Sequence, residues 1–133
     1  MTGPYEVLGP IRLPAETDYE LEDPFLWKDG DEYHLMAKDM WGTLCGEPRA
    51  GVHAVSRDGV EWRWGDPVKA YSRTLVTAEG REVTFGSLER VGLVLRDGEA
   101  THLTAALSNG ATGFADAAGT WNAVFPIAGR HPE

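Results

Sequence analysis

Residues 21–39, LEDPFLWKDGDEYHLMAKD, predict two β-strands joined by a tight turn. Residues 25–27 form an apolar, aromatic-rich run, and residues 33–36 begin a second run of the same kind. Asp29-Gly30 lies between them, and Asp-Gly between apolar runs is a strong hairpin signal, because glycine accepts the positive φ that tight hairpin turns require. Glu22 and Asp23 precede the first strand. Two carboxylates at a strand entrance are expected to face a rim or cavity.

The same pattern returns 68 residues later in the chain. Five positions of the first hairpin are repeated: Asp29, Gly30, His34, Leu35 and Ala37 correspond to Asp97, Gly98, His102, Leu103 and Ala105. Glu22 and Glu89 are 67 residues apart, which predicts a one-residue slip ahead of the strand. A third turn of this kind contains Asp58-Gly59. Repeated hairpins of this type favour a β-propeller or another repeated all-β array, and the alternative is two unrelated hairpins in a β-sandwich.

The 133 residues are expected to form one domain with four successive parts. Residues 1–20 are proline-rich and extended, residues 21–64 form the first blade-like unit, residues 65–107 form the second, and residues 108–133 hold a connection and a closing strand at 121–127. Loops are expected at residues 40–50 and 65–74, and a further hairpin at residues 75–85. No apolar stripe of helical period runs for three turns, so helix should be minor. The predicted fold is all-β, a partial propeller of about two four-stranded blades.

Charge and cysteine content exclude several classes of function. The chain has 12 basic and 21 acidic residues, a formal net charge of −9, and no basic cluster, which argues against nucleic acid and anionic membranes as partners. Cys45 is the single cysteine, so no internal disulfide can form and no paired-cysteine zinc motif exists. It is interpreted as a thiol without catalytic function. No segment has transmembrane length or signal-peptide character, so a cytoplasmic location is expected.

Five ordered segments resemble the five-bladed β-propeller proteins of glycoside hydrolase family 43 and their relatives. The segments are Asp23-Pro24 with its strand and Asp29-Gly30, then GVHAVSRDGVEW at 51–62, AYSRT at 70–74, SLERV at 87–91 and the Asp97-Gly98 hairpin. Together they extend over about residues 3–127. The sequence departs from the family pattern at Val91-Gly92, where relatives usually have proline.

The resemblance implies a catalytic site of carboxylates at the centre of the propeller. In the family, one aspartate is the general base, a second aspartate tunes the acid, and a glutamate is the general acid. The resemblance places the tuning carboxylate at Asp23 and the acid at Glu89, whereas the base has no counterpart in this sequence. Glycoside hydrolysis requires such a pair at a fixed separation. The alternatives are that Asp23 caps backbone amides at a strand entrance and that Glu89 forms a salt bridge with Arg90.

Six further residues are candidates for substrate contacts: Arg90, His53, Asp39, Trp41, Tyr71 and Arg73. Arg90 is expected to face a structural partner or a substrate oxygen. An exposed tryptophan can stack on a sugar ring, whereas a buried one belongs to the core. No cofactor is predicted. Some members of the family hold a central calcium ion, but no spacing in this sequence specifies a metal site.

Three functional hypotheses remain open at this stage. The first is a glycosidase-like protein with an acid and a tuning carboxylate but no base. The second is a non-catalytic carbohydrate-binding or assembly module, and the third is a structural all-β protein. Carbohydrate is the expected partner in the first two cases. A homo-oligomer is also expected, because two blades leave exposed sheet edges at residues 1–20 and 121–127.

Overall fold

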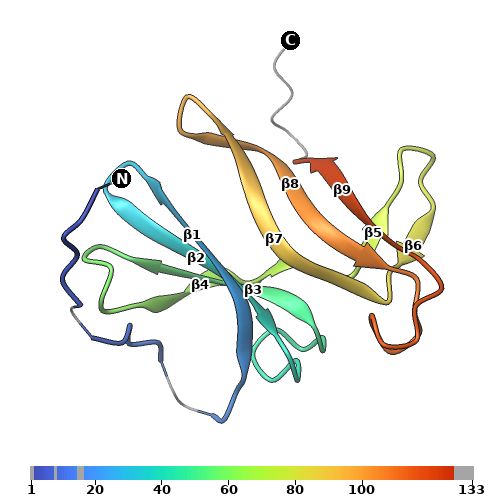
Figure 1. Cartoon of the computed structure of the whole chain (residues 1–133), viewed down its shortest axis with the longest axis horizontal. Helices are drawn as coiled ribbons and strands as arrows, with labels where there is room; N and C mark the ends of the chain where they lie inside the picture. The colour runs from blue at the N-terminus through green and yellow to red at the C-terminus, as the bar shows by residue number, and fades with distance from the viewer. Residues whose placement is uncertain (1, 8, 15–16, 128–133) are drawn as a thin grey trace.

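The computed structural model describes residues 2–7, 9–14 and 17–127, and all regular elements in these ranges are β-strands (Figure 1). The nine strands are β1 (Leu21–Asp29), β2 (Glu32–Asp39), β3 (Ala50–Ser56), β4 (Arg63–Tyr71), β5 (Thr74–Val76), β6 (Glu82–Thr84), β7 (Ser87–Arg96), β8 (Glu99–Ser108) and β9 (Thr120–Pro126). They form three antiparallel sheets, so the all-β prediction is confirmed. None of the described residues form a helix that could cross a membrane.

Two of the sheets carry most of the structure and lie at an angle to each other (Figure 1). The first has the strand order β1-β2-β3-β4, and the second has the order β7-β8-β9, with three strands where four were predicted. The short hairpin β5-β6 links the two sheets in the chain. The first strands of the two sheets, β1 and β7, contact each other. Structural elements that repeat in sequence therefore meet at the junction between the sheets.

Both repeat units contain a β-bulge at the same position. In β1, Glu22 pairs with Lys38 and Phe25 pairs with Met36, so one extra residue lies in β1. In β7 the register shifts in the same way between Glu89 and Gly92. Asp23 and Arg90 occupy equivalent places in these bulges, with φ angles of 52° and 50°. A bulge re-aims the side chains beside it, and bulges are common next to functional sites.

The hairpin register corrects two details of the predicted repeat. Equivalent residues of the two hairpins are 67 apart in β1 and β7 and 68 apart from His34 and His102 onward, so the one-residue slip lies after the turn. Val94 pairs with His102 whereas Leu95 pairs with Ala100, which leaves Thr101 as an extra residue in β8. The first turn consists of Gly30 and Asp31 rather than Asp29-Gly30, since β1 continues through Asp29. The second turn does consist of Asp97-Gly98, and both residues have positive φ.

The loop predicted at residues 65–74 is wrong over most of its length. Strand β4 continues through Tyr71, so the first sheet extends beyond the boundary expected between residues 64 and 65. Pro67 suggested a loop, but β4 is an edge strand with register irregularities, where a missing N–H is tolerated. The predicted hairpin at 75–85 and the closing strand at 121–127 are present as β5-β6 and β9.

Two apolar clusters support the sheets. The larger lies between them and consists of the buried residues Met36, Tyr71, Leu88, Val91, Ala105 and Leu107. The smaller one, with Leu35, Ala54 and Trp62 buried, lies under the N-terminal segment. This segment is held by a parallel bridge between Arg12 and Glu61, as expected for an extended edge. The larger cluster fixes the junction at which the carboxylates of the two units meet.

Candidate functional site

Three carboxylates surround one buried ammonium group at the junction of the two sheets. Lys38 Nζ lies 2.9 Å from Glu22 Oε2, 3.5 Å from Asp23 Oδ2 and 3.3 Å from Glu89 Oε1. Glu22 and Asp23 come from the bulge in β1, Lys38 comes from β2, and Glu89 comes from the bulge in β7. We call these four residues the Lys38 cluster. It unites equivalent positions of the two repeat units in one site.

The structure brings Asp23 and Glu89 close together. Both oxygens contact the same nitrogen, so their separation is at most the sum of 3.5 Å and 3.3 Å. That bound is compatible with the separations of about 5–10 Å seen between the carboxyl groups of glycosidases. The Glu89 side chain is 12% exposed and that of Asp23 is 25% exposed, so neither carboxylate is completely closed off from solvent.

Lys38 remains charged although its side chain is only 4% exposed. Burial lowers its pKa, but hydrogen bonds and Coulombic attraction from Glu22 and Glu89 outweigh burial, and the net pKa is raised above the ordinary 10.5. A buried ammonium is tolerated only with such compensation. The positive charge of Lys38 is therefore compensated by Glu22 and Glu89.

Arg90 and Tyr71 complete the surroundings of the cluster. The Arg90 side chain is 69% exposed, and its Nε lies 4.0 Å from Asp23 Oδ1, so the guanidinium stands at the solvent side of the site. Tyr71 is buried close to the cluster. Burial, followed by the negative charges of Asp23 and Glu89, raises the pKa of the Tyr71 hydroxyl far above its usual value. Its ring also packs so closely against Gly51 that a Cβ there would lie 2.0 Å from it.

The loop after β2 forms a rim at the same end of the sheet. Asp39 pairs with Leu21 next to the cluster, but its carboxylate is fully buried and accepts hydrogen bonds from the N–H groups of Gly42, Leu44 and Cys45. Asp39 therefore shapes the loop and offers no free face to a ligand. Trp41, in the same loop, is 56% exposed. An exposed indole is suited to stacking on a sugar ring.

Arg73 lies outside the cluster and joins segments of the fold. Its Nη1 donates hydrogen bonds to the backbone oxygens of Phe85 and Gly86, and its Nε lies 4.0 Å from Glu47. Glu47 also accepts hydrogen bonds from the Ser72 hydroxyl and the Arg73 N–H. These contacts fix the connection between the first sheet and the β5-β6 hairpin, which is a structural task.

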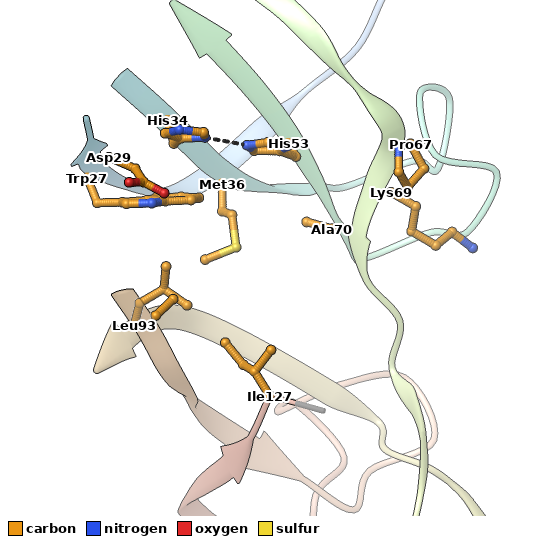
Figure 2. A pocket seen from close by; sticks show the side chains of 11 residues that line it. Trp27, Asp29, His34, Met36, His53, Pro67, Lys69, Ala70, Leu93 and Ile127 are labelled. Atoms are coloured by element: carbon orange, nitrogen blue, oxygen red, sulfur yellow. Dashed lines mark hydrogen bonds between the residues drawn. The ribbon is translucent and has the colours of Figure 1, made fainter. Parts of the chain in front are cut away.

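His53 lines a pocket whose lining includes none of the Lys38 cluster. Its Nε2 lies 3.0 Å from His34 Nδ1, and both rings stack on Trp27. Figure 2 shows these rings on one wall of a pocket of about 380 Å³, with Leu93 and Ile127 on the other side. Burial, and then the neighbouring His34 and Arg63, lower the pKa of His53. His102, the repeat equivalent of His34, is absent from this pocket wall.

Sequence reasoning missed Lys38, Glu22 as a participant, and Ser87. Lys38 lies in an apolar stretch and carries no motif, although its pairing opposite Glu22 follows from the hairpin register. Ser87 is fully buried two residues before Glu89, and its hydroxyl has no hydrogen-bond partner among the described residues. Such an unsatisfied buried group is uncommon and marks a place for a further polar partner.

The carboxylates do not fit a calcium ion. No three His, Cys, Asp or Glu side chains of residues 2–7, 9–14 and 17–127 form a group that could hold a metal. Lys38 already supplies the positive charge between the carboxylates and would repel a second cation.

The Cys45 thiol donates a hydrogen bond to the backbone oxygen of Glu47, and burial raises its pKa, which disfavours the reactive thiolate.

Searches of protein-family models, curated proteins and solved structures found no match to this chain.

Proposed function

We propose that this chain binds carbohydrate through the Lys38 cluster and derives from two blades of a β-propeller. The single observation that carries the proposal is the convergence of Asp23 and Glu89, from equivalent bulges, on the Lys38 ammonium. Charged acceptors and donors held together in fixed positions bind ligand hydroxyls through charge-assisted hydrogen bonds. Trp41 at the rim adds an apolar surface for a sugar ring.

Binding is favoured over hydrolysis by the charge of the cluster. A general acid must give its proton to the leaving-group oxygen, whereas Glu89 Oε1 is engaged by the Lys38 ammonium at 3.3 Å. The sequence resemblance also supplies no general base. A monomer with this cluster should therefore retain a ligand without cleaving it.

Glycoside hydrolysis is the second candidate, and the short separation of Asp23 and Glu89 favours it. In this case Glu89 is the acid, Asp23 orients it, and a base must come from elsewhere. Loss of either partner of such a pair typically costs about 10²–10⁴-fold in rate. The isolated chain should then be a poor hydrolase of aryl glycosides, with a residual rate that Glu89→Gln abolishes.

Calorimetric titration with a panel of neutral oligosaccharides tests the proposal. The wild type should bind at least one of them, and Glu89→Gln should weaken binding by about 10–100-fold, as expected for the loss of a hydrogen bond to a charged group. Glu82→Gln, an equivalent change on the exposed strand β6, should leave binding unchanged. Absence of binding across the panel, or equal losses in the two variants, would contradict a carbohydrate site at the cluster.

A further inference from the structure

Among the described residues, strand β9 has no partner on its outer side, and its outward hydrogen-bonding groups are in place for another strand. Within the described ranges, β9 pairs only with β8, and the sheet ends there. The first sheet has a fourth strand at the corresponding place, β4 beside β3. The two sheets share the same bulge, and their first two strands pair in the same register from the bulge to Trp27↔His34 and Val94↔His102. The second sheet thus lacks one strand of the pattern that the first completes.

The backbone parity of β9 identifies which amides face outward. The Ile127 N–H donates to the Thr101 oxygen, and the Asn109 N–H donates to the Gly119 oxygen, so the odd-numbered residues from 119 to 127 face β8. In an antiparallel ladder the residues between these direct their backbone N–H and C=O groups away from the paired strand. Thr120, Asn122 and Val124 therefore direct their N–H and C=O groups outward. Pro126 has no N–H and limits pairing at that end.

The composition of β9 differs from that of the other outer edge. Residues 120–127, TWNAVFPI, contain no charged side chain. Edge strand β4 contains Arg63, Asp66 and Lys69 and has two register irregularities, which are the features that protect an edge from pairing. In β9, Trp121 is 41% exposed and Val124 is 59% exposed. Among the edge strands of the two larger sheets, within the described residues, β9 alone combines free amides, exposed apolar side chains and the absence of charge.

We infer that β9 pairs antiparallel with β9 of a second copy of this chain. A two-fold axis at Asn122 places this residue opposite its own counterpart and Thr120 opposite Val124, so that all three outward amides are used. The same register places Trp121 opposite Ala123, a large side chain against a small one. A second copy of the chain is a suitable partner because β9 carries no charged side chain. Two molecules of net charge −9 can therefore pair along β9 without placing like charges opposite each other.

This inference gives the expected oligomer a definite edge and register. It is independent of the carbohydrate proposal, because none of the residues of the Lys38 cluster lies in β9. One strand pair buries less area than a standard protein interface, so a dissociation constant of roughly 10–100 μM is expected. Higher salt should tighten the dimer by screening the repulsion between the two chains.

Sedimentation equilibrium over a concentration series from about 1 to 200 μM tests the inference. The wild type should change from monomer to dimer over this range. Asn122→Glu places two carboxylates directly opposite each other and should raise the dissociation constant by about tenfold or more. Val76→Glu, at an exposed valine of β5, is the matched control and should dimerise as the wild type does.

A paired variant tests the register independently. Val124→Glu alone should weaken the dimer, and adding Thr120→Lys should restore it, because the inferred register places these two side chains opposite each other across the interface. Circular dichroism checks that each variant is folded. A wild type that stays monomeric at 200 μM overturns the inference, because β9 then does not pair with a second copy of the chain. A dimer insensitive to Asn122→Glu, or a double variant no tighter than Val124→Glu alone, also overturns it.

Discussion

Replacement of Lys38 by methionine should destabilise the fold because it leaves three carboxylates without their shared cation. Removing one partner of a buried ion pair costs about 3–5 kcal/mol. The carboxylate side chains of Glu22, Asp23 and Glu89 are 45%, 25% and 12% exposed, so water compensates part of this loss. We expect a decrease of about 2–3 kcal/mol in the free energy of unfolding, which for a chain of this size lowers Tm by about 10 °C.

The pH dependence distinguishes loss of charge compensation from loss of packing. Because the pKa of Lys38 is raised in the folded state, its contribution to stability is complete below its ordinary value of 10.5 and is lost as pH rises through the folded pKa. Urea unfolding at pH 7 therefore measures the full effect. As pH rises through the folded pKa of Lys38, above 10.5, the wild type loses this contribution, and the difference between Lys38→Met and the wild type should shrink.

The exposed Lys28 provides the control. Its ammonium lies 5.3 Å from the centre of the Tyr33 ring, an exposed cation–π contact worth about 0.5–1 kcal/mol. Lys28→Met should therefore cost no more than this at pH 7. Equal losses for Lys38→Met and Lys28→Met, or a Lys38→Met deficit that stays constant as pH rises above 10.5, would refute the reasoning.

Three further predictions concern Gly51, Tyr71 and the pocket lined by His34 and His53. Gly51→Ala should lower the free energy of unfolding by about 1–3 kcal/mol, because the new Cβ would overlap the Tyr71 ring, whereas Gly119→Ala should be nearly neutral in the same chemical denaturation. Ultraviolet titration of tyrosine should show one group, lost in Tyr71→Phe, that ionises well above the usual pKa near 10. Because the pKa of His53 is lowered by folding, its contribution to stability is present above about pH 6.5 and lost as pH falls. His53→Gln should reduce the loss of stability between pH 7 and 5, and an unchanged pH slope would contradict this origin.

Much of the fold was predictable from the sequence because hairpin signals are local. The Asp97-Gly98 turn and the repeated apolar runs identified the strands that became β1-β2 and β7-β8. The end of the first sheet was missed, since Pro67 in β4 has the sequence character of a loop and only its position at a sheet edge makes it acceptable. An edge is defined by tertiary structure, which no local pattern reports.

The candidate site was predictable in part for a related reason. Asp23 and Glu89 could be paired from the repeat because equivalent bulges place them at equivalent strand entrances. Lys38 could not be found in this way, because its role comes from burial between two units rather than from a motif. Asp39 shows the opposite error: a carboxylate near the site that the loop at residues 40–49 uses for its own amides.

The most direct test of the account is an NMR titration of uniformly ¹⁵N-labelled protein with the oligosaccharide panel. Chemical-shift changes should be centred on Glu22, Asp23, Glu89 and Arg90, should include the indole N–H of Trp41, and should be lost in Glu89→Gln. Shift changes centred on the pocket of His34 and His53, or none at millimolar sugar, would contradict the claim that the Lys38 cluster is a carbohydrate site.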